Sequence, residues 1–189
     1  MNRCRIIGGK LKRRFIAAPG ISSTRPTSDI VKQSLFNVLV HRFQIDFQKT
    51  FAVDLFAGSG SLGIEAISYG CEKVLFIDSN YQAINCIKNN LESLDISRFA
   101  HVIKQSAERI YDGIFQESAG GFKNVLIFMD PPYAEKNLLK SQILRFSELF
   151  KEKKLFIVAE SDEEFNIEGL TSSIATRHGN TVVSVFSKK

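Results

Sequence analysis

The chain has 189 residues, of which 44% are hydrophobic and 24% are charged, with a formal net charge of +5. This length and balance are typical of a single globular domain and exclude a disordered chain. Apolar runs are short, as in Val125 to Met129, whereas a membrane helix needs roughly 20 residues, and no secretory signal follows the charged N-terminus. We therefore expect a cytoplasmic protein. Three cysteines without paired spacing predict neither disulfides nor a bound metal.

Positive charge is concentrated near the N-terminus. Residues 1–50 carry ten Lys or Arg and only two Asp, whereas acids outnumber bases in the remainder. A basic segment on a mildly acidic body indicates contact with a polyanion such as nucleic acid. Charge alone leaves open a solvated basic surface with no partner. We expect residues 1–45 to form a basic extension and residues 46–189 to form the main domain.

The extension is predicted to contain a hairpin, a loop and a helix. Residues 3–7 and 10–17 are strand-like runs separated by Gly8-Gly9, a typical two-residue turn. The second run carries cations that we expect to contact phosphate: Lys10, Lys12, Arg13 and Arg14. After a polar loop, Ser28 or Asp29 is predicted to cap a helix with apolar residues at helical spacing, namely Val31, Leu35, Phe36 and Leu39.

From residue 50 onward, strand and helix patterns alternate. The predicted strands cover residues 51–55, 74–78, 100–104, 125–130 and 155–160, and most are apolar runs typical of a parallel sheet buried on both faces. A helix with clear apolar spacing is predicted over 81–94, and residues 172–186 read as an antiparallel hairpin. The expected fold class is α/β, a Rossmann-like three-layer sandwich. Its sheet is seven-stranded and mostly parallel, with the antiparallel hairpin at the C-terminus and a small hairpin and helix at the N-terminus.

A glycine-rich segment follows the first of these strands. Gly58, Gly60 and Gly63 form a G-x-G-x-x-G pattern, and Asp78 ends the next strand. The pattern is typical of nucleotide sites, where glycines allow close backbone approach and the acid binds ribose hydroxyls. Asp54, just before the loop, is unfavourable beside a pyrophosphate but suits the ammonium and sulfonium groups of S-adenosyl-L-methionine (SAM). This charge argument favours SAM over NAD without deciding between them.

A second motif, Asp130-Pro131-Pro132-Tyr133, follows the apolar strand that ends near residue 129. In a parallel sheet, this position lies at the same edge as the glycine loop. Because prolines lack N–H groups, the motif offers a carboxylate and carbonyl acceptors beside an aromatic ring. These groups can accept the hydrogens of an exocyclic amine and stack on its base, which frees the nitrogen lone pair to displace a methyl group directly. The motif therefore predicts an amino methyltransferase without a metal or a protein nucleophile.

The combination of DLFAGSGSLGIEA with DPPY resembles the class I, Rossmann-like methyltransferases that act on amino groups of bases. The N-terminal residues RIIGG, RPT with Asp29, and LFN resemble those of the RsmD family over about residues 3–160. That family methylates N2 of guanine 966 in bacterial 16S ribosomal RNA. The sequence departs from the family at Ile30, where an Arg is frequent, and at Ser106, where an acid or Asn is more typical.

The resemblance implies a set of site residues. Its cofactor contacts would be Asp54, Phe56, Ala57, Gly58, Ser59, Gly60, Asp78, Ser79, Ser106 and Ala107. Its catalytic, base-binding residues would be Asp130, Pro131, Pro132 and Tyr133, and Arg25 and Thr27 would join the basic residues that contact RNA. The implied partner is 16S rRNA within the small ribosomal subunit or an assembly intermediate. The protein is expected to act as a monomer and to bind neither a membrane nor a metal.

Three alternatives remain at this point. The DPPY motif can also bind the amine of adenine, so the enzyme could be a DNA or RNA adenine-N6 methyltransferase. The chain is, however, too short to include a separate domain that reads DNA. The glycine pattern also occurs in NAD-dependent oxidoreductases, against which Asp54 argues. A non-enzymatic RNA-binding factor would leave DPPY unexplained.

Overall fold

The computed structural model describes residues 3–20, 28–131, 136–179 and 181–188. The chain begins with a two-stranded antiparallel sheet of β1 (Arg3–Arg5) and β2 (Phe15–Ala17), in which Cys4 lies opposite Ile16. Because side chains alternate along a strand, Cys4 and Ile16 are buried, whereas Arg3, Arg5 and Phe15 face outward. The predicted hairpin is therefore present.

Its predicted two-residue turn is wrong. Residues 6–14 connect the two strands and include the 3₁₀ turn η1 (Gly9–Leu11), so Lys10 to Arg14 lie in this connection instead of on a strand. The two glycines are explained by the close approach of helix α2. A Cβ on Gly8 would lie 2.0 Å from the Tyr69 hydroxyl, and one on Gly9, where φ is +66°, would lie 2.0 Å from the carbonyl oxygen of Ser68.

The predicted N-terminal helix is α1 (Asp29–Asn37). Ser28 is its N-cap, because its hydroxyl oxygen accepts a hydrogen bond from the Val31 N–H at 3.4 Å, and such a cap satisfies a free N–H of the first turn. The helix continues into the π-helical turn η2 (Val38–Arg42), and the short 3₁₀ turn η3 (Phe47–Lys49) leads to the main sheet. Three of the four predicted apolar residues are fully buried: Leu35, Phe36 and Leu39.

The main sheet has seven strands in the order β5-β4-β3-β6-β7-β9-β8. They are β3 (Thr50–Asp54), β4 (Lys73–Asp78), β5 (Ala100–Lys104), β6 (Asn124–Met129), β7 (Lys154–Ser161), β8 (Thr171–His178) and β9 (Thr181–Ser187). The first five are parallel, and β9 pairs antiparallel with both β7 and β8. The predicted Rossmann-like fold with an antiparallel C-terminal hairpin is thus confirmed.

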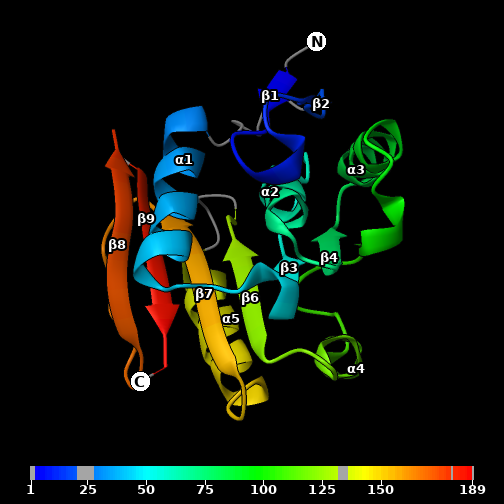
Figure 1. Ribbon diagram of the computed structural model, residues 1–189. Coiled ribbons are helices and arrows are strands. Elements are labelled where there is room, and N and C mark those ends of the chain that lie inside the picture. Colours follow the sequence, from blue (N-terminus) through cyan, green and yellow to red (C-terminus); the bar gives the residue numbers. More distant parts are fainter. Residues whose placement is uncertain (1–2, 21–27, 132–135, 180, 189) are drawn as a thin grey trace.

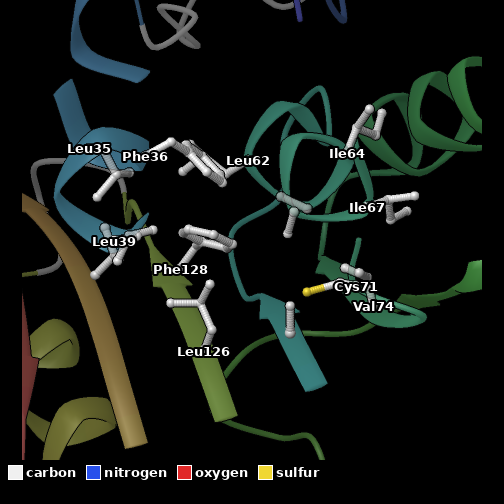
Figure 2. Packing of buried hydrophobic residues seen from close by; sticks show 14 of the residues in the cluster. Leu35, Phe36, Leu39, Leu62, Ile64, Ile67, Cys71, Val74, Leu126 and Phe128 are labelled. Atoms are coloured by element: carbon white, nitrogen blue, oxygen red, sulfur yellow. The ribbon is translucent and has the colours of Figure 1, made fainter. Parts of the chain in front are cut away.

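Helices cover both faces of this sheet. They are α2 (Ser61–Tyr69), α3 (Tyr81–Ser93), α4 (Asp112–Ala119) and α5 (Lys136–Leu149), and the 3₁₀ turn η4 (Ser97–Phe99) precedes β5. One core joins the N-terminal hairpin, α1, α2 and α3 to one sheet face, and a second joins α4 and α5 to the other. In Figure 2, Phe36 of α1 and Leu62 of α2 lie over Phe128 of β6, and the rings of Phe36 and Phe128 are 6.0 Å apart.

The parallel strands bring their carboxyl ends to one edge of the sheet. In Figure 1, β4 and β6 point toward the end of the molecule that carries the β1–β2 hairpin, whereas α4 lies at the other end. The basic extension and the loops after the central strands are therefore at the same end. Within the described part of the chain, none of the helices is long and apolar enough to span a membrane.

Candidate functional site

The glycine loop is a tight connection from β3 to α2. Gly58 and Gly60 have φ values of +53° and +77°, a region that residues with a side chain rarely adopt. The Ala57 N–H donates to the Ile77 carbonyl at 3.0 Å, which holds the loop against β4. Gly63 serves packing, since a Cβ there would lie 2.3 Å from the Phe76 ring. The first two glycines thus shape the loop, and the third lets α2 approach the sheet.

Asp54 ends β3 beneath this loop, with only 4% of its surface exposed. Its Oδ2 accepts a hydrogen bond of 2.9 Å from the Gly63 N–H in the first turn of α2. Burial raises the pKa of Asp54 to about 7, the Gly63 N–H opposes that rise, and the nearby charge of Asp78 adds to it. A buried carboxylate in this state binds a cation favourably, because the cation offsets the cost of its ionised form.

Asp78 ends the neighbouring strand β4 and is half-buried. Its two carboxylate oxygens accept hydrogen bonds from the Gly58 N–H at 2.9 Å and the Asn80 N–H at 2.8 Å. The Gln105 N–H donates to the Asp78 carbonyl at 3.0 Å, so the loop after β5 starts beside this residue. These bonds orient the carboxylate next to the glycine loop, in the position where this fold binds ribose hydroxyls.

Asp130 and Glu160 form a second acidic pair at the same edge. Asp130 follows β6, and Glu160 lies near the end of β7, one residue beyond the paired Met129 and Ala159. Burial raises the pKa of Asp130, and the charges of Glu160 and then Asp54 raise it further. Burial also raises the pKa of Glu160. Pro131 is half-buried beside Asp130, whereas Pro132 and Tyr133 lie outside the described residues.

The remaining predicted cofactor residues line the loops after β3, β4 and β5. In the first loop, Phe56 and Ser59 are half-buried and Ala57 is buried, and Ser79 is exposed after β4. Ser106 is half-buried after β5, and Ala107 is buried. The structure therefore places the predicted cofactor residues in loops at one edge of the sheet, and Ser79 is the exposed residue among them.

Two side chains outside the predicted set hold these loops. Arg145 of α5 donates to the carbonyls of Ala107 at 2.8 Å and Ile110 at 2.6 Å, which fastens the loop after β5. Asn90 of α3, 3% exposed, donates to the Ser59 carbonyl at 3.0 Å and to the Ala17 carbonyl at 2.9 Å, and accepts from the Ala17 N–H at 2.8 Å. Asn90 thus joins the glycine loop directly to strand β2.

A buried ion pair fastens the other side of the extension. Glu65 of α2 is fully buried, and its carboxylate accepts hydrogen bonds from the Ile7 N–H at 2.8 Å and the Gly8 N–H at 3.4 Å. Lys32 of α1, 1% exposed, lies 3.3 Å from the same carboxylate and also donates to the Arg5 carbonyl. One carboxylate therefore holds the connection between β1 and β2 against the helix that begins at the glycine loop.

The predicted RNA-binding residues of the hairpin are all exposed: Lys10, Lys12, Arg13 and Arg14. Arg13 has a φ of +73° and its N–H donates to the Ile6 carbonyl at 2.8 Å. The two predicted loop residues, Arg25 and Thr27, lie outside the described residues. The structure thus presents the basic residues of the connection between β1 and β2 on one small element.

The sequence contains signals for some of these additional residues. Asn90 occupies a buried position among the apolar residues of α3, and Glu65 is an acid inside a helix that is buried over Ser61–Ser68. A polar residue inside an apolar pattern is buried only when its hydrogen bonds are satisfied, which points to a structural role. No comparable pattern marks Arg145, because the Ala107 and Ile110 carbonyls and the Asp112 carboxylate that it contacts are distant in the sequence.

A family model described as "Conserved hypothetical protein 95" matches residues 4–187 of the chain. "Putative rRNA methyltransferase YlbH" of Bacillus subtilis is 38% identical over 189 residues, which cover 98% of this chain and 99% of the relative. "Ribosomal RNA small subunit methyltransferase D" of Haemophilus influenzae is 35% identical over 164 residues, which cover 80% of this chain and 81% of the relative.

Solved structures agree with these relatives. The structure of "Putative methyltransferase yhhF" from Escherichia coli superposes with a TM-score of 0.74 at 25% identity, and the match covers 100% of this chain and 99% of that one. The family match extends from β1 to β9, so it includes the basic extension as well as the site at the sheet edge. The chain therefore belongs to the RsmD family of methyltransferases.

Proposed function

We propose that this protein transfers the methyl group of SAM to the exocyclic N2 of a guanine in bacterial 16S ribosomal RNA. One observation carries the proposal: Asp130 and Pro131 of the DPPY motif follow β6 directly beside β3, whose last residue is Asp54. A hydrogen-bond acceptor for an amine and an acid suited to a cation therefore share one edge. Membership of the RsmD family supports the same reaction.

The residues present fit SAM. Three acids, Asp54, Asp130 and Glu160, have raised pKa values at adjoining strand ends, and a cationic ligand relieves the electrostatic cost of their ionisation. Such a cluster opposes the pyrophosphate of NAD. Asp78, oriented by the Gly58 and Asn80 N–H groups, suits ribose hydroxyls. When bound, SAM supplies an electrophilic methyl group on its sulfonium sulfur.

The chain's own residues would prepare the amine. In the ionised state, the Asp130 carboxylate accepts a hydrogen of the guanine N2 amine, which withdraws the nitrogen lone pair from the ring. The raised pKa makes this carboxylate a better proton acceptor than an ordinary Asp, so it can take the proton that the amine must lose. Pro131 adds a backbone carbonyl that can accept a hydrogen bond but no competing backbone donor, because proline has no N–H.

The basic residues of the extension would bind the substrate. They lie on an element that Asn90 attaches to the glycine loop and Glu65 attaches to α2. RNA bound to this element would therefore have a fixed position relative to the site. Two relatives are named as acting on ribosomal RNA, one of them on the small subunit. We propose that the substrate is 16S rRNA within the small subunit or an assembly intermediate, and that the protein acts as a cytoplasmic monomer.

The proposed function is tested by methyl transfer from labelled SAM to small ribosomal subunits from cells that lack this protein. Digestion of the RNA then identifies the labelled nucleoside. We expect N2-methylguanosine. Label in N6-methyladenosine would show that the target base is adenine. SAM binding without any label would show that the proposed acceptor RNA is wrong.

The raised pKa of Asp54 makes a testable prediction for cofactor binding. Because a cation favours the ionised carboxylate, SAM affinity should rise about tenfold between pH 6 and pH 8, across the pKa of about 7. Calorimetry in buffers of different ionisation enthalpy should detect proton release near pH 6. Asp54→Asn should bind SAM more weakly and with a flatter pH dependence, and an unchanged pH dependence in this variant would contradict the assignment.

The same pKa predicts how the stability of the free protein depends on pH. The folded-state pKa of Asp54 lies above its unfolded value, so this group stabilises the fold in acid and loses that contribution as the pH rises through about 7. The melting temperature of the free protein should therefore fall from pH 6 to pH 8, and SAM should raise it more at pH 8.

Arg13 provides a separate test of the basic turn. Its positive φ costs about 1 kcal/mol in a residue with a Cβ, and glycine avoids this cost. Arg13→Gly should keep or increase the stability while it weakens binding to RNA, because one phosphate contact is lost. Urea unfolding and RNA titration of the same sample separate the two effects, and RNA affinity equal to that of the wild type would remove Arg13 from the interface.

A further inference from the structure

The outer face of the β1–β2 hairpin carries an exposed aromatic ring. Phe15 is 56% exposed, and it is the only exposed residue among the sixteen phenylalanines, all of which lie in the described part of the chain. Its strand neighbour Ile16 is 2% exposed and belongs to the core. The alternation of the strand therefore directs Phe15 outward although the chain has ample apolar core in which to bury a ring.

The hairpin that carries this ring is rich in cations. Arg5 is the residue directly opposite Phe15 across the hairpin, and Arg3 is two residues further along the same exposed face of β1. Arg14 precedes Phe15, and Lys12 and Arg13 come just before it, all three exposed. No Asp or Glu occurs between residues 3 and 20 of the sequence. The Arg5 guanidinium forms an ion pair of 2.8 Å with the carboxylate of Asp29, which begins helix α1.

A single exposed apolar side chain is common and by itself carries no argument. The surrounding charge changes this, because an aromatic ring within a cluster of cations has the composition of a surface that binds single-stranded nucleic acid. In such surfaces the cations bind the backbone, and the ring stacks on a base of any identity. Bases in a duplex are already stacked on one another, so a ring at the surface can reach only unpaired ones.

We propose that Phe15 is a stacking platform for an unpaired base of the RNA substrate, with Arg3 and Arg5 holding the adjoining backbone. The occupant is single-stranded RNA, since the charge complementarity favours a polyanion and the ring adds a base contact that a phosphate alone would not need. The inference rests on the proposed function, because it names how the substrate of that site is held. It gives the hairpin a preference for looped over paired RNA, which the cations alone would not provide.

The platform lies where it can serve the site. Figure 1 shows the hairpin at the end toward which β4 and β6 point, and Ala17 of the same strand is bonded to Asn90, which also holds Ser59 of the glycine loop. A base stacked on Phe15 is thus fixed on an element bonded to the glycine loop. A neighbouring nucleotide must leave its own stack to enter the site, as in other enzymes that modify a base.

The experiment measures binding of a fluorescein-labelled single-stranded RNA and of a blunt RNA duplex of the same sequence, by anisotropy over a series of salt concentrations. Phe15→Ala should lower the affinity for the single strand by about 5- to 150-fold, the range typical of a lost base stack, and leave the duplex affinity nearly unchanged. Its salt slope should stay that of the wild type. Lys12→Ala should weaken both RNAs and flatten the single-strand slope by about 0.7 if it contacts one phosphate.

Matched variants protect the interpretation. Phe15→Tyr should retain most of the affinity, whereas Phe15→Leu, which stays apolar but cannot stack, should lose it. Tyr111 is 74% exposed and is the N-cap of α4, the helix at the other end of the molecule, so Tyr111→Ala should bind as the wild type does. The platform alone would be overturned if Phe15→Ala lost equal affinity for the single strand and the duplex, or if Phe15→Leu bound the single strand as the wild type does. Wild-type protein that binds neither RNA would also overturn the platform, whereas the proposed function fails only if small ribosomal subunits gain no N2-methylguanosine in the transfer assay.

Discussion

Asp130→Asn should reduce methyl transfer by about 10²- to 10⁴-fold, the range that a positioned proton acceptor contributes. The amide keeps the size of the side chain, and its oxygen can still accept a hydrogen bond, but it cannot take the proton that the guanine amine must lose. Because Asp130 lies after β6 and outside the glycine loop, the substitution leaves that loop unchanged, and SAM binding should be largely retained. Single-turnover transfer from labelled SAM and calorimetric titration of SAM measure the two effects separately.

Glu160→Gln is the matched control for Asp130. The charge of Glu160 is the second contributor, after burial, to the raised pKa of Asp130. Its removal should lower that pKa, so the acid limb of the pH–rate profile should move to lower pH while the enzyme stays active. If Asp130→Asn turned over normally, or if Glu160→Gln were the variant without activity, the assignment of the proton acceptor to Asp130 would be wrong.

The order of elements in the main domain could be predicted because buried parallel strands have a strong local signal. Their apolar runs are short, and polar residues such as Asp54 and Asp78 mark the points where the strands end. The parallel arrangement then brings those ends to one edge, so a site could be predicted from residues far apart in the chain. The strand bounds agree within one residue, which is the normal uncertainty of a strand end.

The prediction of a two-residue N-terminal turn is wrong because a tertiary contact, and not a tight turn, requires its two glycines. Gly8-Gly9 between two strand-like runs has the local appearance of a tight turn, yet both glycines are needed where Tyr69 and Ser68 of α2 approach the backbone. The roles of Asn90, Glu65 and Arg145 could not be predicted for the same reason, since these side chains bind groups that are distant in the sequence. Local patterns identify which residues are unusual in their surroundings, whereas only the assembled fold identifies what they hold.

Lys32→Met should destabilise the protein by about 3–5 kcal/mol, because it leaves the fully buried Glu65 carboxylate without its counter-ion. The Ile7 and Gly8 N–H groups still donate to this carboxylate, but they do not neutralise its charge. Burial already raises the pKa of Glu65, and Lys32 is the main influence that lowers it. Without Lys32 the carboxyl group should protonate more easily, so the loss of stability, measured by urea unfolding, should be smaller at pH 5 than at pH 8.

Two variants decide whether burial is the cause. Lys49 forms an exposed ion pair with Asp46 at 2.7 Å, so Lys49→Met removes the same charge at the surface and should leave the stability nearly unchanged. The double variant Lys32→Met, Glu65→Gln should recover part of the lost stability, because a neutral amide oxygen can still accept from the Ile7 N–H. If Lys32→Met cost no more than Lys49→Met, the buried pair would not be what fastens the basic extension to α2, and Asn90 would be left as the main polar link between that extension and the glycine loop.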